Sequence, residues 1–216
     1  MLTSQNKAAL NRVFHPLALR LARTGISPST LTLATPVLAT LVALWFFRTH
    51  AVIPFCLLFT VVGMLDALDG ALARATNRIT PFGGYLDAMC DRYVEAIGAL
   101  AVAAVTGYWA LISIAIIGSL LVSYAKARAA MEIPISNLEW PDLMERTERA
   151  IVFLGGLFVS ALVPWKPMGR DLFWWVLVAF AVLVHGTVLQ RVARARRFIQ
   201  GRAGSTGLMG TRQKPL

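Results

Sequence analysis

Long apolar stretches, separated by short polar links that contain proline or glycine, run through most of the chain. A helix needs about 20 mainly apolar residues to cross the roughly 30 Å hydrocarbon layer of a bilayer. The pattern therefore predicts six transmembrane helices and an all-α integral membrane fold. The expected ranges are approximately 28–47, 51–75, 82–106, 109–130, 150–165 and 172–190.

A shorter helical pattern precedes the first crossing. Apolar positions between Leu10 and Arg23 recur at helical spacing, whereas the arginines of this segment lie off that stripe. This pattern predicts an N-terminal amphipathic helix that lies in the membrane interface and does not span the bilayer. Ser27 and Pro28 fit the N-cap and the first position of the first crossing helix.

The chain shows no internal repeat and no second domain. We expect an N-terminal segment with the interfacial helix at 1–26, a six-helix membrane domain at 27–199 and a disordered basic tail at 200–216. The first residues are polar, so no cleavable signal peptide is expected. Cys56 and Cys90 fall inside apolar spans, where we expect them to pack as small side chains without a disulfide.

Composition supports the membrane assignment, because 57% of the 216 residues are hydrophobic and only 15% are charged. The formal net charge of +10 is unevenly distributed, and the odd-numbered connections hold only Arg48, Lys166 and Arg170. The positive-inside rule then places both termini and the even-numbered connections in the cytoplasm, beside the cell (inner) membrane. A basic chain can also bind nucleic acid, but contact with anionic membrane lipids explains the charge of so apolar a chain better.

Four aspartates lie near the predicted cytoplasmic ends of two successive apolar helices. Asp66 and Asp69 are three residues apart and Asp87 and Asp91 are four apart, so each pair occupies one helix face. The link between the helices is short, which lets the two faces converge. Carboxylates that meet at low dielectric repel one another unless cations neutralise them. An all-oxygen ligand set favours Mg²⁺ or Mn²⁺, and two ions about 3.5–4 Å apart would clamp phosphoryl oxygens.

Small residues beside the acids leave room for a ligand. Gly70 and Ala73 lie one turn from the acidic face, and Arg74 is placed to pair with a phosphate. The alternative is a structural role, in which the acids and Arg92 form buried ion pairs that only hold helices together. We favour a functional role because charges within a membrane are costly.

One extended motif resembles, at every specified position, the signature of the CDP-alcohol phosphotransferases. Its eight fixed residues read Asp66-x2-Asp69-Gly70-x2-Ala73-Arg74-x8-Gly83-x3-Asp87-x3-Asp91. The six spans, the interfacial helix and the length are also similar to that family, so the resemblance covers essentially the whole chain. It implies transfer of a phosphate-linked group from a CDP-activated lipid to an alcohol, with release of CMP.

The same resemblance implies roles for individual residues. The four aspartates would bind a binuclear Mg²⁺ or Mn²⁺ centre, and Asp91 would also act as the base that takes the proton of the acceptor hydroxyl. A homodimer is implied as well. The residues implied to bind the CDP-lipid are Ser29, Thr30, Leu31, Thr32, Gly70, Ala73, Arg74 and Thr80.

A second set of residues resembles one branch of the family, the prokaryotic phosphatidylinositol phosphate synthases and their archaetidylinositol phosphate counterparts. It lies in the segments 123–129, 145–149 and 190–191. The donor implied by this branch is CDP-diacylglycerol or CDP-archaeol, and the acceptor is inositol phosphate. The residues implied to bind the acceptor phosphate are Lys126, Arg128, Arg149 and Arg191.

Three alternatives remain open from the sequence. Each of these basic residues, taken alone, could be a snorkelling residue that obeys the positive-inside rule. The 132–144 connection does not match the inositol branch, which leaves glycerol 3-phosphate as a rival acceptor. Intramembrane aspartates also occur in cation transporters. Against a transporter, the chain shows no inverted halves and its motif acids are confined to one side of the membrane.

Overall fold

The computed structural model describes residues 14–132 and 143–210, with side chains up to residue 200. Within these ranges all regular structure is helical, which confirms the predicted all-α class. A helical segment at 14–22 comes first in the described chain. It is followed by α2 (Pro28–Thr49), α3 (Val52–Ala75), α4 (Pro81–Thr106), α5 (Trp109–Glu132), α6 (Arg146–Leu162), the 3₁₀ turn η1 (Pro167–Gly169) and α7 (Leu172–Gly210).

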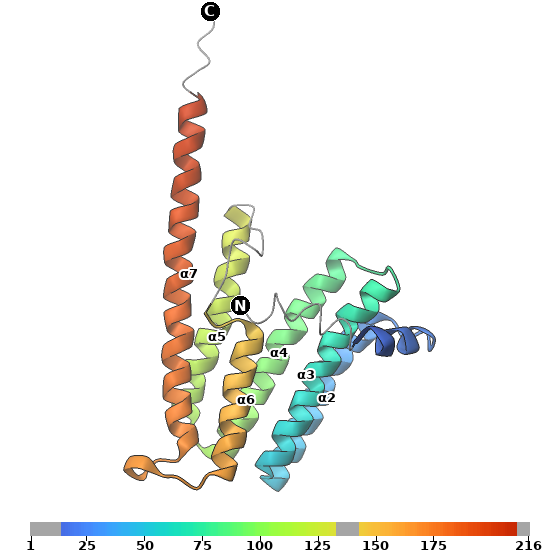
Figure 1. Ribbon diagram of the computed structural model, residues 1–216, viewed down its shortest axis with the longest axis vertical. Coiled ribbons are helices and arrows are strands. Elements are labelled where there is room, and N and C mark those ends of the chain that lie inside the picture. The colour runs from blue at the N-terminus through green and yellow to red at the C-terminus, as the bar shows by residue number, and fades with distance from the viewer. Residues whose placement is uncertain (1–13, 133–142, 211–216) are drawn as a thin grey trace, which may run out of the picture.

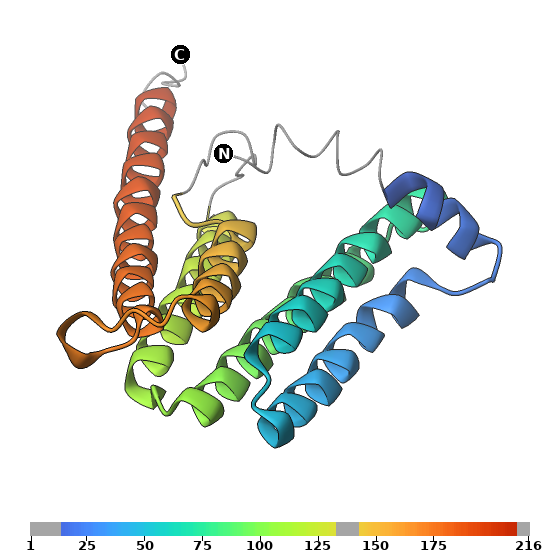
Figure 2. The same ribbon diagram turned by 60° about the horizontal axis from the view of Figure 1, so that its bottom comes forward.

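The long helices form two groups that stand side by side (Figures 1 and 2). In one group α2 packs against α3 and α4, and in the other α7 packs against α5 and α6. Contacts of α3 with α6 and of α4 with α5 join the groups. Among the described helices α2, α3, α5 and the 172–200 part of α7 are long and apolar enough to cross a membrane. The chain is therefore a multi-pass membrane protein.

Local sequence fixes where several helices begin. Ser27 accepts a hydrogen bond from the backbone N–H of Thr30 at 3.1 Å and Pro28 opens α2, as predicted. Thr80 caps α4 in the same way, accepting from the N–H of Gly83 at 3.0 Å. A reciprocal capping box between residues 145 and 148 begins α6. These caps fix the helix ends that carry the polar residues described below.

The segment 14–22 runs across the direction of the other helices, beside the end of α3 (Figure 1). Phe14 and Ala18 are buried against Leu68 and Ala71 of α3. The apolar stripe of this segment therefore packs, at least in part, on protein. The first residues of the predicted interfacial helix, 10–13, lie outside the described residues, as does the connection 133–142.

The last helix differs in length from what the sequence predicted. A disordered tail was expected from residue 200, but α7 continues to Gly210. Extending an existing helix costs far less than starting one, so polar composition alone does not end it. Residues 211–216 lie outside the described residues.

Aromatic side chains fill the interior of the first group. The rings of Phe46 and Phe55 stack with centroids 4.0 Å apart, and Phe59 lies 5.2 Å from Phe55. Cys56 and Cys90 are buried and free, as predicted. This core holds α2 and α3 in a fixed relation below the aspartates.

Glycines set the spacing between several helices. A Cβ atom added to Gly156 of α6 would lie 2.4 Å from Cγ1 of Val176 on α7. One added to Gly118 of α5 would lie 2.6 Å from Cγ2 of Val184, also on α7. These helices therefore approach so closely that only glycine fits at the contact.

We predict that Gly156→Ala destabilises the protein by about 1–3 kcal/mol, the usual cost of overpacking. The cost arises because the β-branched Val176 cannot turn away easily. Gly155→Ala on the same helix is the matched control, since a Cβ there meets nothing within 4 Å. Thermal unfolding in detergent measures both variants, and equal stability of the two would contradict the close α6–α7 contact.

Candidate metal and phosphate site

Three of the four motif aspartates meet where α3 faces α4. Asp66 and Asp69 of α3 and Asp87 of α4 each offer a carboxylate oxygen, and these oxygens lie within 4.8 Å of one another. Asp66, Asp69 and Asp91 are buried, and Asp87 is half-buried. The predicted convergence of the two acidic helix faces is therefore confirmed.

A hydroxyl from α2 holds one of these acids. Thr32 donates from Oγ1 to Oδ2 of Asp69 at 2.5 Å, and both residues are buried. The contact joins α2 to α3 at the level of the acids. Thr32 was predicted as a CDP-lipid contact, and its described hydroxyl bonds go to Asp69 and to the carbonyl of Pro28.

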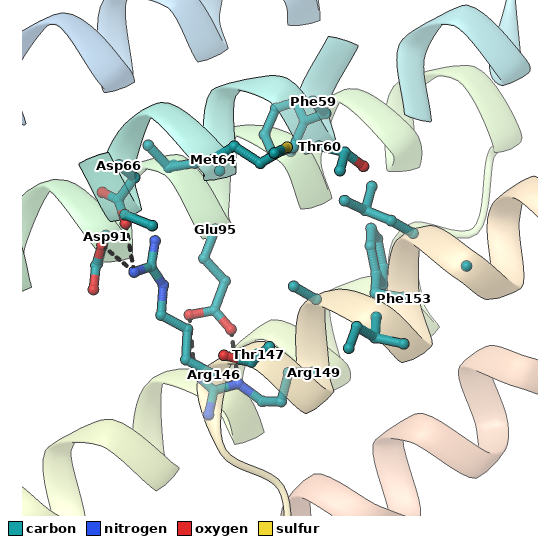
Figure 3. A pocket seen from close by; sticks show the side chains of 18 of the residues that line it. Phe59, Thr60, Met64, Asp66, Asp91, Glu95, Arg146, Thr147, Arg149 and Phe153 are labelled. Atoms are coloured by element: carbon teal, nitrogen blue, oxygen red, sulfur yellow. Dashed lines mark hydrogen bonds and ion pairs between the residues drawn. The ribbon is translucent and has the colours of Figure 1, made fainter. Parts of the chain in front are cut away.

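The first residue of α6 contacts the acids from the opposite side of the cavity. Arg146 Nη1 lies 2.7 Å from Oδ2 of Asp66 and 2.6 Å from Oδ1 of Asp91 (Figure 3). Asp91 is therefore linked to the other acids through a shared cation. Arg146 was not among the predicted site residues, and its position directly after the Glu145 cap is the local signal that could have identified it.

The donor set fits a hard divalent ion. All candidate ligand atoms are carboxylate oxygens, and one of them, Oδ1 of Asp66, is buried without a hydrogen-bond partner among the described residues. A buried carboxylate oxygen that lacks a donor is costly unless a cation satisfies it. Asp66, Asp69 and Asp87 are the residues placed to bind a metal together.

A cavity of about 860 Å³ opens between α3, α4 and α6, and α5 also contributes to its lining. Its polar end is lined by the four aspartates together with Arg74 and Arg146. Apolar side chains, among them Phe59, Met64 and Phe153, line much of the remaining wall (Figure 3). A ligand that fills this cavity therefore has a polar part at one end and an apolar part at the other, and an anionic polar part would need cations bound to the acids.

The predicted CDP-lipid residues are divided by the structure. Gly70 and Arg74 line the cavity beside the acids, and a Cβ added to Gly70 would lie 3.4 Å from Nη1 of Arg74. Thr80 is the exposed N-cap of α4, and Ala73 is half-buried. Residues 29–31 lie in the first turn of α2 and are not among the cavity-lining residues.

Of the four predicted acceptor residues, Arg149 lines the cavity. Its side chain is only 3% exposed and is held by Glu95 of α4, with Nε 2.9 Å from Oε1 and Nη2 3.2 Å from Oε2. Nη1 also donates to the carbonyl of Met144 at 3.2 Å. Glu95 lines the same cavity and was missed by the sequence analysis, because its partner lies 54 residues away.

The other three predicted acceptor residues lie outside the cavity lining. Arg191 of α7 is buried and donates to the carbonyl of Val122 on α5. Arg128 pairs with Glu132 one turn along α5, and Lys126 is half-buried on the same helix. The structure thus brings Arg146 and Arg149 to the cavity wall, whereas these three residues lie on helices α5 and α7 beside it.

Residues 25–186 match the family model of the CDP-alcohol phosphatidyltransferases. The chain is 35% identical over 182 residues to archaetidylinositol phosphate synthase of Pyrococcus horikoshii, covering 83% of this chain and 89% of that protein. It is 36% identical over 199 residues to phosphatidylinositol phosphate synthase of Mycobacteroides abscessus, covering 86% of this chain and 84% of the relative.

Solved structures agree with these matches. The crystal structure of Mycobacterium tuberculosis phosphatidylinositol phosphate synthase with CDP-DAG bound superposes with a TM-score of 0.75 at 27% identity, covering 85% of this chain and 94% of that one. The same enzyme in complex with manganese and citrate gives a TM-score of 0.74, covering 84% of this chain and 88% of that one.

We predict that Glu95 and Arg149 stabilise the fold as a coupled pair. Glu95→Ala should cost about 1.5–3 kcal/mol, because it removes a bidentate partner from a buried cation. The double variant Glu95→Ala/Arg149→Ala should cost clearly less than the sum of the single changes. Chemical unfolding in detergent measures the free energy of unfolding of the wild type, the two single variants and the double variant, which together form a double-mutant cycle.

The exposed pair of Arg128 and Glu132 is the control for this cycle, since both side chains are 49% exposed. Its coupling should be at most about 0.5 kcal/mol, as for other surface pairs within one helix. A Glu95–Arg149 coupling no larger than that of the control would show that the buried pair does not hold α4 to α6.

Proposed function

Because the chain belongs to the CDP-alcohol phosphatidyltransferase family, we propose that it transfers the phosphatidyl or archaetidyl group of a CDP-activated lipid to inositol phosphate. The observation that carries this proposal is the cavity, which joins a cluster of acids to an apolar wall within one space. The two relatives named above are inositol phosphate lipid synthases, and the CDP-DAG bound to one solved relative is a lipid of this class.

The donor occupies the cavity along its length. The CDP portion lies at the polar end against Gly70 and Arg74, where the glycine leaves room beside the helix and the guanidinium pairs with phosphate. Ala73, Thr80 and the first turn of α2 complete the contact with the CDP portion. The hydrocarbon chains follow the apolar wall. CDP-diacylglycerol and CDP-archaeol share this division into an anionic and an apolar part.

The four aspartates are assigned as ligands of two Mg²⁺ or Mn²⁺ ions, and the manganese in a solved relative supports this assignment. Bound ions would stabilise the charge on the bridging phosphate oxygens. Asp91 takes the proton of the acceptor hydroxyl, and the hydroxyl oxygen bonds to the phosphorus beside the lipid. The bond from this phosphorus to the oxygen of CMP breaks, and CMP leaves with the bonding electrons.

The acceptor phosphate is assigned to the basic side chains near the acids. Arg149 already lines the cavity, and Lys126, Arg128 and Arg191 lie on the neighbouring helices α5 and α7. A phosphomonoester carries nearly two negative charges at pH 7, which several cations together can balance. The names of both curated relatives support inositol phosphate as this acceptor.

The proposed membrane arrangement has six spans. The two that composition alone does not establish are α4, which carries the charged residues of the site, and α6, which has only 17 residues. Both pack against helices long enough to span the bilayer. Residues 27–199 form the membrane domain, segment 14–22 lies at the interface, and the site and both termini face the cytoplasm. The protein is also proposed to form a homodimer.

An acceptor panel tests this function. Purified protein with CDP-diacylglycerol and Mg²⁺ should release CMP fastest with inositol phosphate, and more slowly with glycerol 3-phosphate, serine or free inositol. Chelation of the metal should abolish release. Asp91→Asn is the control, with an expected loss of about 10²–10⁴-fold, the usual contribution of a general base.

Each outcome of the panel has a distinct meaning. Preference for glycerol 3-phosphate would leave the chemistry in place and overturn the acceptor. Preference for free inositol or serine would also remove the proposed phosphate-binding role of the basic residues. Cation flux into vesicles without any CMP release would contradict the enzymatic function and support cation transport.

A further inference from the structure

Arg146 contacts two of the proposed metal ligands with a single nitrogen atom. Its Nη1 lies 2.7 Å from Oδ2 of Asp66 on α3 and 2.6 Å from Oδ1 of Asp91 on α4 (Figure 3). The arginine side chain is 38% exposed, whereas the two aspartate side chains are 6% and 10% exposed. A partly exposed cation from α6 therefore neutralises two buried acids on different helices.

The aspartates receive different partners. Asp69 accepts a hydrogen bond from the uncharged hydroxyl of Thr32, so that contact supplies no positive charge. Asp66 and Asp91 each form an ion pair with Arg146. Two buried carboxylates close together require such a charge, since each disfavours ionisation of the other.

A divalent ion held by Asp66 and Asp91 would share these two carboxylates with Arg146. Mg²⁺ binds carboxylate oxygens at about 2.0–2.1 Å. A guanidinium nitrogen 2.7 Å from Oδ2 of Asp66 and 2.6 Å from Oδ1 of Asp91 already places one positive charge between the two helices. The nitrogen and the ion cannot both occupy this position, because two cations there would also repel each other.

We propose that Arg146 and a divalent ion are alternative partners of Asp66 and Asp91, an inference that rests on the metal site proposed above. When an ion binds, the guanidinium moves away from the two carboxylates into the cavity that Arg146 already lines. The reciprocal capping box of Glu145 and Glu148 fixes the start of α6, so the movement is confined to the side chain. Arg146 thus lowers the affinity for the ion and keeps the ion-free acids neutralised.

Manganese binding to purified protein at neutral pH tests this competition. Arg146→Gln removes the competing cation, so this variant should bind Mn²⁺ about ten- to 150-fold more tightly than the wild type. This ratio corresponds to the free energy of one hydrogen bond between charged groups. The free Mn²⁺ signal in electron paramagnetic resonance gives the affinity without any activity assay. Arg146→Lys keeps the charge and should give an intermediate affinity. If Arg146→Gln fails to fold, the same measurement is made on Arg146→Lys.

If Arg146 and Mn²⁺ compete, the contribution of Arg146 to stability should depend on whether Mn²⁺ is bound, and unfolding temperatures measure this. In EDTA, Arg146→Gln should unfold about 3–10 °C below the wild type, and saturating Mn²⁺ should remove most of this difference. Arg149→Gln is the matched control on the same helix, because Arg149 pairs with Glu95. Its destabilisation should be the same in EDTA and in Mn²⁺, and its affinity for Mn²⁺ should stay within about twofold of the wild type.

The outcomes separate this inference from the proposed function. Wild-type protein that binds Mn²⁺, together with Arg146 variants of equal or weaker affinity, would overturn the competition and leave the metal site intact. Wild-type protein that binds no Mn²⁺ would overturn the metal site, and the inference with it. A loss of stability that Mn²⁺ does not reverse would show that Arg146 only ties α6 to α3 and α4.

Discussion

Four carboxylates within one apolar helical bundle impose the main physical constraint on this structure. Three of their oxygens lie within 4.8 Å of one another, and each acid disfavours ionisation of its neighbours. Side chains from two neighbouring helices contribute to stabilising them. The hydroxyl of Thr32 comes from α2 and the guanidinium of Arg146 from α6. The assigned metal ions would supply the remaining charge, so binding the metal and stabilising the fold depend on the same atoms.

The shape of the cavity follows from how the helices approach this cluster. The α3 and α4 helices carry the acids at one level and apolar side chains below, and α6 closes the space from the other side. Two arginines in the first turn of α6 form ion pairs with these helices. Arg146 pairs with the aspartates and Arg149 pairs with Glu95. The resulting space is anionic at one end and apolar along its length. With cations bound to the acids, this division would match the two halves of a CDP-activated lipid.

Local features of the fold and the site were predictable from the sequence. The spacing of Asp66 and Asp69 fixes a shared helix face, and the short link before Thr80 forces the two acidic helices together. Ser27 and Pro28 mark the start of α2 through bonds to the next turn. These predictions succeed because each depends on residues a few positions apart.

Contacts between distant segments were not predictable in the same way. Arg146 meets Asp66 across 80 residues, and its place after the Glu145 cap marks a helix start without indicating which distant acid it contacts. A basic residue at a helix end can be placed along the membrane normal, but the rotation of its helix depends on packing. Arg191, for which the resemblance implies a role at the acceptor phosphate, donates to the carbonyl of Val122 on α5, a contact that its own turn does not predict.

The central claim is that these four aspartates form a two-metal centre, and the spectrum of bound Mn²⁺ tests it most directly. At saturation the purified wild-type protein should bind two Mn²⁺ ions per chain and give the signal of a magnetically coupled pair, as expected for ions about 3.5–4 Å apart. Asp69→Asn should lose this coupled signal. A single isolated Mn²⁺ ion in the wild type, or a coupled pair that persists in Asp69→Asn, would contradict the account.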